Sequence, residues 1–122
     1  MKIAVPCSEK NINGPIYQAF GRAPYFLIVD SESMAYESID NAAMNAGGGA
    51  GIQAAQIVAD SGAEVLIAPR CGQNAANVLM PAGVKLMKAV SGTIAEVVDL
   101  YKQGQLETLE DIHAGHHGQR LS

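Results

Sequence analysis

GGGAGIQAAQIVADSGAEVLIAPRCGQNAAN, residues Gly47–Asn77, is the stretch of sequence that decides the fold. Two turns that contain glycine, 47–51 and 70–74, each precede a segment with helical spacing of apolar residues, and the apolar run Val65–Ala68 between them has the length of a buried strand. Glycine permits backbone conformations closed to other residues and lets a ligand approach the main chain. Because a strand, a turn and a helix in this order place backbone N–H groups at the carboxyl edge of a sheet, we expect a ligand site there.

The segments on both sides of this stretch complete an α/β pattern. Tyr25–Val29 and Met34–Ile39 are β-prone runs joined by a short polar link, so they should form an antiparallel hairpin. Thr93, with Glu96 three residues later, predicts a capping box at the start of a last helix. The other expected elements are strands at Lys2–Val5, Val65–Ala68 and Val84–Met87, and helices after Gly51 and after Asn74. This order predicts an α/β domain in three α/β/α layers, with a five-stranded mixed sheet and helices on both faces.

Length and composition favour a single domain. The chain has 122 residues and is 48% hydrophobic, enough to bury one core and too short for two domains. From Gln105 the composition turns polar, and we expect the domain to span residues 1–106, followed by a flexible His-containing tail, 107–122.

Charge and cysteine usage exclude several classes of function. A net charge of -4 and only eight scattered Lys and Arg residues argue against a nucleic-acid partner. No apolar run approaches the length of a membrane span or of a signal-peptide core, so we expect no membrane partner and a cytoplasmic location. Cys7 and Cys71 lack the dense spacing of a secreted disulfide scaffold and are expected to be free thiols.

Three stretches in one order carry a resemblance to a known family: FGRAPYFLIVD (Phe20–Asp30), GGGAGIQAAQIVADSGAEVLIAPRCGQNA (Gly47–Ala75) and AGVKLMKAVSGTIAEVVDLYKQGQL (Ala82–Leu106). They resemble the small standalone members of the nitrogenase iron-molybdenum cofactor biosynthesis domain family, over nearly the whole chain. The resemblance implies a ribonuclease H-like fold and the binding or carriage of iron-sulfur or iron-molybdenum type clusters. The family motif usually has a His before Phe-Gly, and this position is Ala19, so one expected cluster ligand is missing.

The cysteines are the first candidate ligands. Cys71 is predicted at a helix start, which would lower its thiol pKa, favour the metal-binding thiolate and make it more reactive than Cys7. Cys7 follows the first strand and would reach the same sheet edge if the two strands are parallel neighbours. The alternative for each cysteine is a purely structural role as a small buried side chain.

The tail and the turns supply the remaining candidates. The His cluster of the tail is spaced to bind a divalent metal, or belongs to a terminus with no specific role. The glycine turn provides N–H donors for an anionic group, or is a simple chain crossing. Gly21 and Arg22 are expected to close the mouth of the same site, where Arg22 pairs with an anionic cluster or a carboxylate, or else forms an ordinary surface salt bridge. The candidate cofactor-binding residues are therefore Cys7, Arg22, Gly47, Gly48, Gly49, Cys71, Gly72 and Asn74, and the candidate metal ligands are Cys7, Cys71, His113, His116 and His117.

Three functions compete for this site. The leading hypothesis is a non-catalytic binding or carrier protein for an iron-sulfur or iron-molybdenum type cofactor or its precursor, with cofactor-assembly proteins as further partners. The alternative is a small-molecule or nucleotide-binding regulatory domain that uses the glycine turn as an anion cradle. An enzyme with Cys71 as nucleophile ranks last, because no His or Asp partner lies near it in sequence. The expected strands at 3–5 and 65–68 carry no carboxylate for metal-dependent hydrolysis.

Overall fold

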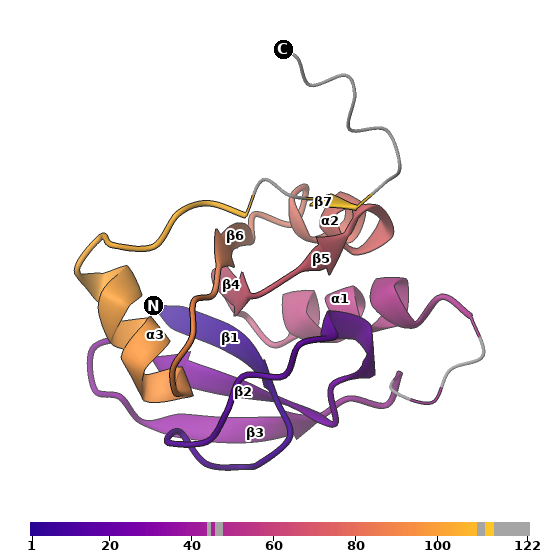
Figure 1. Cartoon of the computed structure of the whole chain (residues 1–122). Coiled ribbons are helices and arrows are strands. Elements are labelled where there is room, and N and C mark those ends of the chain that lie inside the picture. Colours follow the sequence, from indigo (N-terminus) through magenta and orange to yellow (C-terminus); the bar gives the residue numbers. More distant parts are fainter. Residues whose placement is uncertain (44, 46–47, 110–111, 114–122) are drawn as a thin grey trace.

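The fold is a three-layer α/β/α sandwich (Figure 1). The structure, a computed structural model, describes residues 1–43, 45, 48–109 and 112–113, the last pair by the backbone alone. Helices α1 (Ala50–Asp60) and α2 (Gln73–Leu79) lie on one side of a central sheet, and α3 (Ile94–Lys102) lies on the other. Within these described residues, no helix is long and apolar enough to cross a membrane.

The central sheet has five strands in the order β3-β2-β1-β4-β6. The hairpin of β2 and β3 is antiparallel, and β2 also runs antiparallel to β1, whereas β1, β4 and β6 are parallel to one another. The strands are β1 (Lys2–Cys7), β2 (Tyr25–Asp30), β3 (Tyr36–Asp40), β4 (Val65–Ala68) and β6 (Lys85–Lys88). The predicted α/β class and five-stranded mixed sheet are confirmed, and the arrangement is compatible with a ribonuclease H-like fold.

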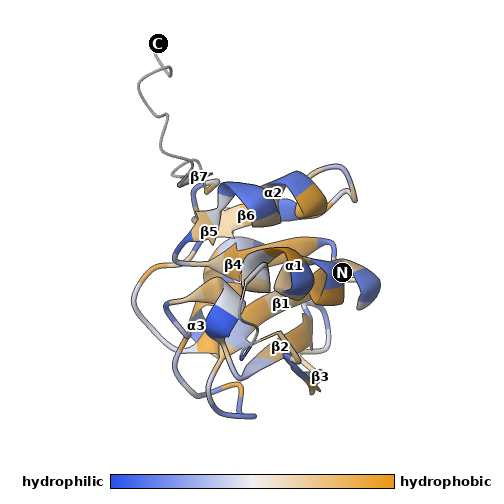
Figure 2. Ribbon diagram, turned by 90° about the vertical axis from the view of Figure 1, so that its right-hand side faces the viewer, coloured by the Kyte–Doolittle hydropathy of each residue, from blue (hydrophilic) through white to orange (hydrophobic). Residues whose placement is uncertain are grey.

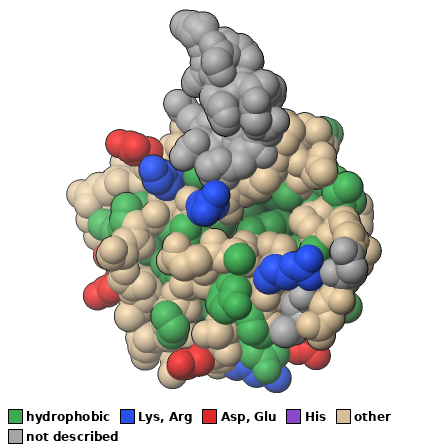
Figure 3. All heavy atoms as spheres, turned by 45° about the vertical axis from the view of Figure 1, so that its right-hand side comes forward, with side chains coloured by type: hydrophobic (Ala, Val, Ile, Leu, Met, Phe, Trp, Pro, Cys, Tyr) green, Lys and Arg blue, Asp and Glu red, His purple; other side chains and the backbone are tan. Residues whose placement is uncertain are grey.

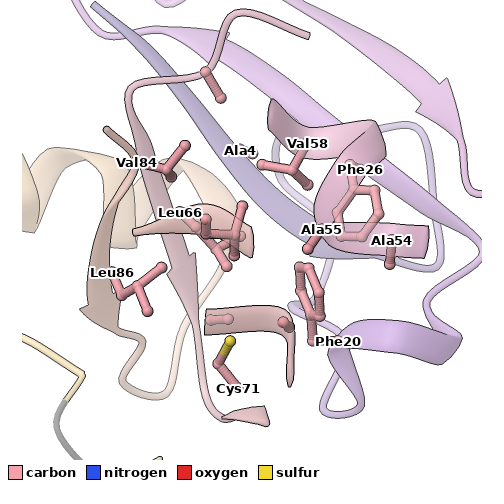
Figure 4. Packing of buried hydrophobic residues seen from close by; sticks show 14 of the residues in the cluster. Ala4, Phe20, Phe26, Ala54, Ala55, Val58, Leu66, Cys71, Val84 and Leu86 are labelled. Atoms are coloured by element: carbon pink, nitrogen blue, oxygen red, sulfur yellow. The ribbon is translucent and has the colours of Figure 1, made fainter. Parts of the chain in front are cut away.

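The central strands are apolar on both faces because both faces are covered by helices. Every residue of β4 is buried, and its side chains alternate between two hydrophobic clusters. Leu66 and Ala68 pack toward α1 and α2, whereas Val65 and Ile67 pack toward α3. Figure 2 shows the sheet in hydrophobic colours, with hydrophilic residues on the outer sides of α2 and α3. Figure 4 shows Leu66 packed in the first of these clusters.

Local sequence signals explain where several elements begin. The capping box of α3 is confirmed: Glu96 N–H donates to the Thr93 hydroxyl oxygen at 3.2 Å, and Thr93 N–H donates to the Glu96 carboxylate at 2.8 Å. The third strand begins at Tyr36 and not at Met34, because Met34 adopts φ 62° in a turn. The Asp30 carboxylate accepts the Glu32 N–H at 2.9 Å and stabilises this turn.

Two short elements lie outside the main sheet. A 3-10 turn, η1 (Phe20–Arg22), lies in the segment that connects β1 to β2. Strands β5 (Cys71–Gly72) and β7 (Ile112–His113) form a small parallel pair. The chain beyond α3 thus returns to the turn that follows β4.

Packing continues past the predicted domain end at residue 106. Lys88 N–H donates to Glu107 O at 2.8 Å and Leu109 N–H donates to Leu86 O at 2.9 Å, so residues 107–109 cover the outer edge of β6. The Leu109 side chain is 4% exposed and belongs to the cluster beneath α1 and α2. These three residues are part of the folded domain. Most of the rest of the expected flexible tail lies outside the described residues.

We therefore expect Leu109→Ala to lower the free energy of unfolding by about 2–4 kcal/mol, because it removes a buried side chain from a packed cluster. Glu107→Ala, an exposed neighbour on the same segment, should change it by less than about 0.5 kcal/mol. Urea unfolding followed by circular dichroism measures both. Equal, small effects would show that the segment is not docked.

Candidate functional site

A cavity of about 750 Å³ lies where η1, the start of α1 and the turn after β4 meet. Figure 3 shows this side of the molecule, with a hollow floored by hydrophobic side chains and Lys or Arg side chains on either side of it. The cavity is lined by Gln18, Ala19, Phe20, Gly21, Gly49, Ala50, Gly51, Ile52, Arg70, Cys71, Gly72, Gln73, Asn74 and Ala75. Its position agrees with the ligand site expected at the carboxyl ends of parallel strands.

The first turn of α1 faces the cavity with its main chain. Gly49, the residue before the helix, has φ 70°, a conformation that favours glycine. Gln53 N–H makes the first helical hydrogen bond, to Gly49 O at 3.0 Å, so the N–H groups of Ala50, Gly51 and Ile52 precede the helical ladder. No side-chain hydrogen bond among the described residues caps this helix start. These N–H groups and the positive end of the helix favour a negatively charged or electron-rich ligand.

The charges around the cavity differ from those of the whole chain. The protein has a net charge of -4 and 12 acidic residues, yet within the described part of the chain the cavity lining contains no Asp or Glu. The charged residue in the lining is Arg70. The local field therefore favours anions, although the protein as a whole is acidic.

Cys71 lines the cavity but is only 1% exposed. Its sulfur lies 3.6 Å from Gly72 O, and Figure 4 shows the side chain at the edge of the buried cluster, with Phe20 at the same end. Burial raises the pKa of the Cys71 thiol to about 11. The prediction of a lowered thiol pKa is therefore wrong. Helix α2 begins two residues later, at Gln73, and the loss of water around the sulfur disfavours the thiolate.

Cys7 lies on the other face of the sheet. It alternates in phase with Ile3 and Val5 along β1, and all three side chains belong to the cluster beneath α3, whereas Cys71 belongs to the cluster beneath α1 and α2. Burial also raises the pKa of the Cys7 thiol to about 11, and its sulfur lies 3.6 Å from Tyr25 O. The structure thus separates the two cysteines that were expected to face one pocket. Both are free, as expected.

The other predicted site residues divide into three groups. Gly49, Gly72 and Asn74 line the cavity together with Cys71, whereas Arg22 is exposed and Gly48 is solvent-facing, and neither lines it. Gly47, His116 and His117 lie outside the described residues, and His113 is placed by its backbone alone, opposite Gly72 in the β5–β7 pair. Among the side chains described, no three His, Cys, Asp or Glu residues gather as a metal-binding group.

Sequence reasoning found only part of the cavity wall formed by residues 18–21: Gly21, expected at the mouth of the site, lines the cavity, whereas Gln18, Ala19 and Phe20 were not expected there. Ala19, the position at which the resembled motif usually has His, lies in this wall. An ideal Cβ on Gly21 would lie only 3.1 Å from the Gly51 nitrogen, so η1 packs directly on the first turn of α1. A Phe-Gly pair in a loop between strands is the one local signal of such a contact, and it does not identify the partner segment.

Taken together, these features define a small α/β domain with an anion-favouring cavity at the carboxyl edge of its sheet. The family model described as dinitrogenase iron-molybdenum cofactor matches residues 1–104, and the chain belongs to this family.

The chain is similar to several proteins over nearly its full length. An uncharacterized protein of Methanocaldococcus jannaschii is 33% identical over 113 residues, 90% of this chain and 92% of the relative. The apo form of the orange protein from Desulfovibrio gigas has a TM-score of 0.87 and 35% identity, covering 93% of this chain and 96% of that one. A NifB-like protein from Thermotoga has a TM-score of 0.79 and 34% identity, covering 93% and 97%.

The raised thiol pKa values predict a loss of stability in alkali. A thiol that ionises near pH 9 when unfolded and near pH 11 when folded stabilises the folded state fully below pH 9, and this contribution is lost as the pH rises to 11. Each cysteine should thus destabilise the fold by up to about 2–3 kcal/mol at pH 11. Urea unfolding at pH 8 and pH 10.5 measures the loss, and Cys71→Ala should reduce it by about half. An unchanged pH dependence in that variant would contradict the burial of the Cys71 thiol.

Proposed function

We propose that this protein is a non-catalytic binding or carrier protein for an anionic metal-sulfur cofactor, of iron-sulfur or iron-molybdenum type, or for its precursor. Membership of the iron-molybdenum cofactor family supports an association with this class of cofactor. The observation that carries the proposal is the cavity itself, which combines backbone donors, one thiol and no carboxylate within the described lining. Cofactor-assembly proteins are the proposed partners for delivery and release.

The residues of the cavity fit a cluster that arrives with its own sulfide ligands. Cys71 is the single soft ligand in the described lining, and assembly of a cluster from protein ligands usually takes several thiolates. The N–H groups at the start of α1 can instead hydrogen-bond to sulfide or oxide atoms on the surface of a preformed anionic cluster. Arg70 adds positive charge at the same cavity. Cys71 is then the thiolate that anchors the cluster to the protein, and binding must deprotonate it because its pKa is raised.

The regulatory alternative predicts a different ligand at the same donors. A nucleotide would place its phosphate at the α1 turn, where a cluster would place its sulfides. Titrations with tetrathiomolybdate, an anionic molybdenum sulfide with visible absorption bands, and with ATP therefore separate the two readings. Binding of ATP without binding of tetrathiomolybdate would contradict the cofactor proposal.

A charge variant tests whether the cavity selects anions. Gln73→Glu places a carboxylate in the lining and should weaken tetrathiomolybdate binding roughly tenfold, because like charges repel across a partly desolvated cavity. A Glu in the first turn of α2 favours that helix, so folding should be preserved. Gln105→Glu, the same change at an exposed position away from the cavity, is the matched control and should leave the Kd unchanged. Equal affinities for both variants would contradict an anion-selective cavity.

The two cysteines form a second matched pair. Cys71→Ala should abolish retention of iron or molybdenum after anaerobic reconstitution with ferrous iron, sulfide and tetrathiomolybdate, because the cavity loses its thiolate ligand. Cys7→Ala removes a thiol from the opposite face and should retain the metal, and replacement of His116 should weaken retention less than Cys71→Ala. Metal analysis after gel filtration measures all three. Unchanged metal content in Cys71→Ala would remove Cys71 from the proposed site.

A further inference from the structure

Asn41 is a buried polar residue that contacts the walls of the cavity without lining it. Asn41 is the residue directly after β3, and it is 2% exposed. The amide Nδ2 donates to Ala23 O at 2.8 Å and to Gly21 O at 3.2 Å, and Oδ1 accepts the Ala43 N–H at 3.1 Å. The Asn41 main-chain N–H donates to Pro24 O at 3.0 Å. One residue thus bonds to three carbonyls and one N–H, and its own side chain is buried.

These bonds join two segments that are distant in sequence. Gly21 belongs to η1 and Ala23 is the residue that ends it, so two of the bonds hold this turn from its carbonyl side. The bond to Ala43 fixes the chain on the route from β3 toward α1. An asparagine amide has both donors and an acceptor, so it can connect carbonyls on one segment with an N–H on another.

The turn η1, which Asn41 holds, also packs against the first turn of α1 with little spare room. A Cβ on Gly21 would lie 3.1 Å from Gly51 N and 3.2 Å from Gly51 Cα, closer than side chains normally pack. Phe20, beside Gly21, packs against Phe26 with ring centroids 5.3 Å apart and belongs to the same buried cluster as Cys71. A small displacement of η1 would therefore move Phe20 and open the cavity toward Cys71.

We infer that Asn41 is a positioning residue, which sets the shape of the cavity by holding η1 against the first turn of α1. Its effect on ligand binding rests on the proposed function, whereas its effect on cavity shape does not. Loss of the two Nδ2 bonds removes a donor from the buried Ala23 carbonyl and from the partly buried Gly21 carbonyl, which favours local opening of this wall.

The two cysteines are built-in reporters of such opening. Cys71 lines the cavity, Cys7 lies beneath α3 on the opposite face, and burial raises both thiol pKa values to about 11. Because each variant is compared with wild type, a change in the ratio of the two alkylation rates reports a change in access to one face relative to the other. Global unfolding exposes both thiols together, whereas displacement of η1 exposes Cys71 alone.

The experiment compares alkylation of both cysteines by iodoacetamide, followed by mass spectrometry, in wild type and three variants. Asn41→Asp keeps an acceptor for Ala43 and removes both amide donors. Gly21→Ala pushes η1 away from the first turn of α1, because the added Cβ would lie too close to Gly51. This variant keeps the test valid if Asn41→Asp fails to fold. Val97→Ala, in the core beneath α3, is a control for general loss of stability.

For Asn41→Asp and Gly21→Ala, the alkylation rate of Cys71 should rise about tenfold relative to that of Cys7. A rise of this size corresponds to the local stability that is lost when buried hydrogen bonds or close packing are broken. For Val97→Ala this ratio should stay the same or fall. A ratio in Asn41→Asp that matches Val97→Ala would overturn the positioning role and leave Asn41 as a general stabilising residue.

Binding of tetrathiomolybdate to the same proteins separates the two proposals. Weaker binding in Asn41→Asp, by a factor similar to the alkylation ratio, supports a role in the proposed function. Failure of wild type to bind, with the alkylation ratio changed as expected, would contradict the proposed function and support the positioning role of Asn41.

Discussion

The rest of this structure depends on the burial of β1 and β4 on both of their faces. A strand that is apolar on every residue must be covered twice, so the chain places α1 and α2 on one side and α3 on the other. The parallel strands then require crossovers, and the turns of these crossovers emerge at one edge of the sheet. The cavity lies at that edge because the backbone there is no longer engaged in the sheet.

The chemistry of the cavity follows from its construction out of turns and helix starts. Main-chain groups and the side chains of Gln18, Arg70, Gln73 and Asn74 supply its polarity, and the acidic residues of the described chain lie elsewhere. Such a surface attracts anions without a dedicated set of charged side chains. The single thiol is buried and protonated at neutral pH, which distinguishes this cavity from sites that hold a cluster through several exposed thiolates.

Part of the candidate site could be predicted from local sequence, because the turns after strands are recognisable. Gly49, Cys71, Gly72 and Asn74 were placed at the carboxyl edge by the strand-turn-helix pattern, and they line the cavity. Cys7 was assigned to the same pocket, although its alternation with Ile3 and Val5 already directed it to the face beneath α3. The thiol pKa of Cys71 was predicted with the wrong sign, because helix position is visible in sequence and depth of burial is not.

The sequence by itself determined the α/β class, the hairpin, the capped start of α3 and the two turns at the sheet edge, since each depends on residues close together along the chain. Only the tertiary structure decided that η1 packs directly on the first turn of α1, that Asn41 joins η1 to the approach to α1, and that residues 107–109 cover the edge of β6. These features are contacts between segments separated by tens of residues. No local periodicity encodes them, because they depend on which surfaces meet after the sheet has formed.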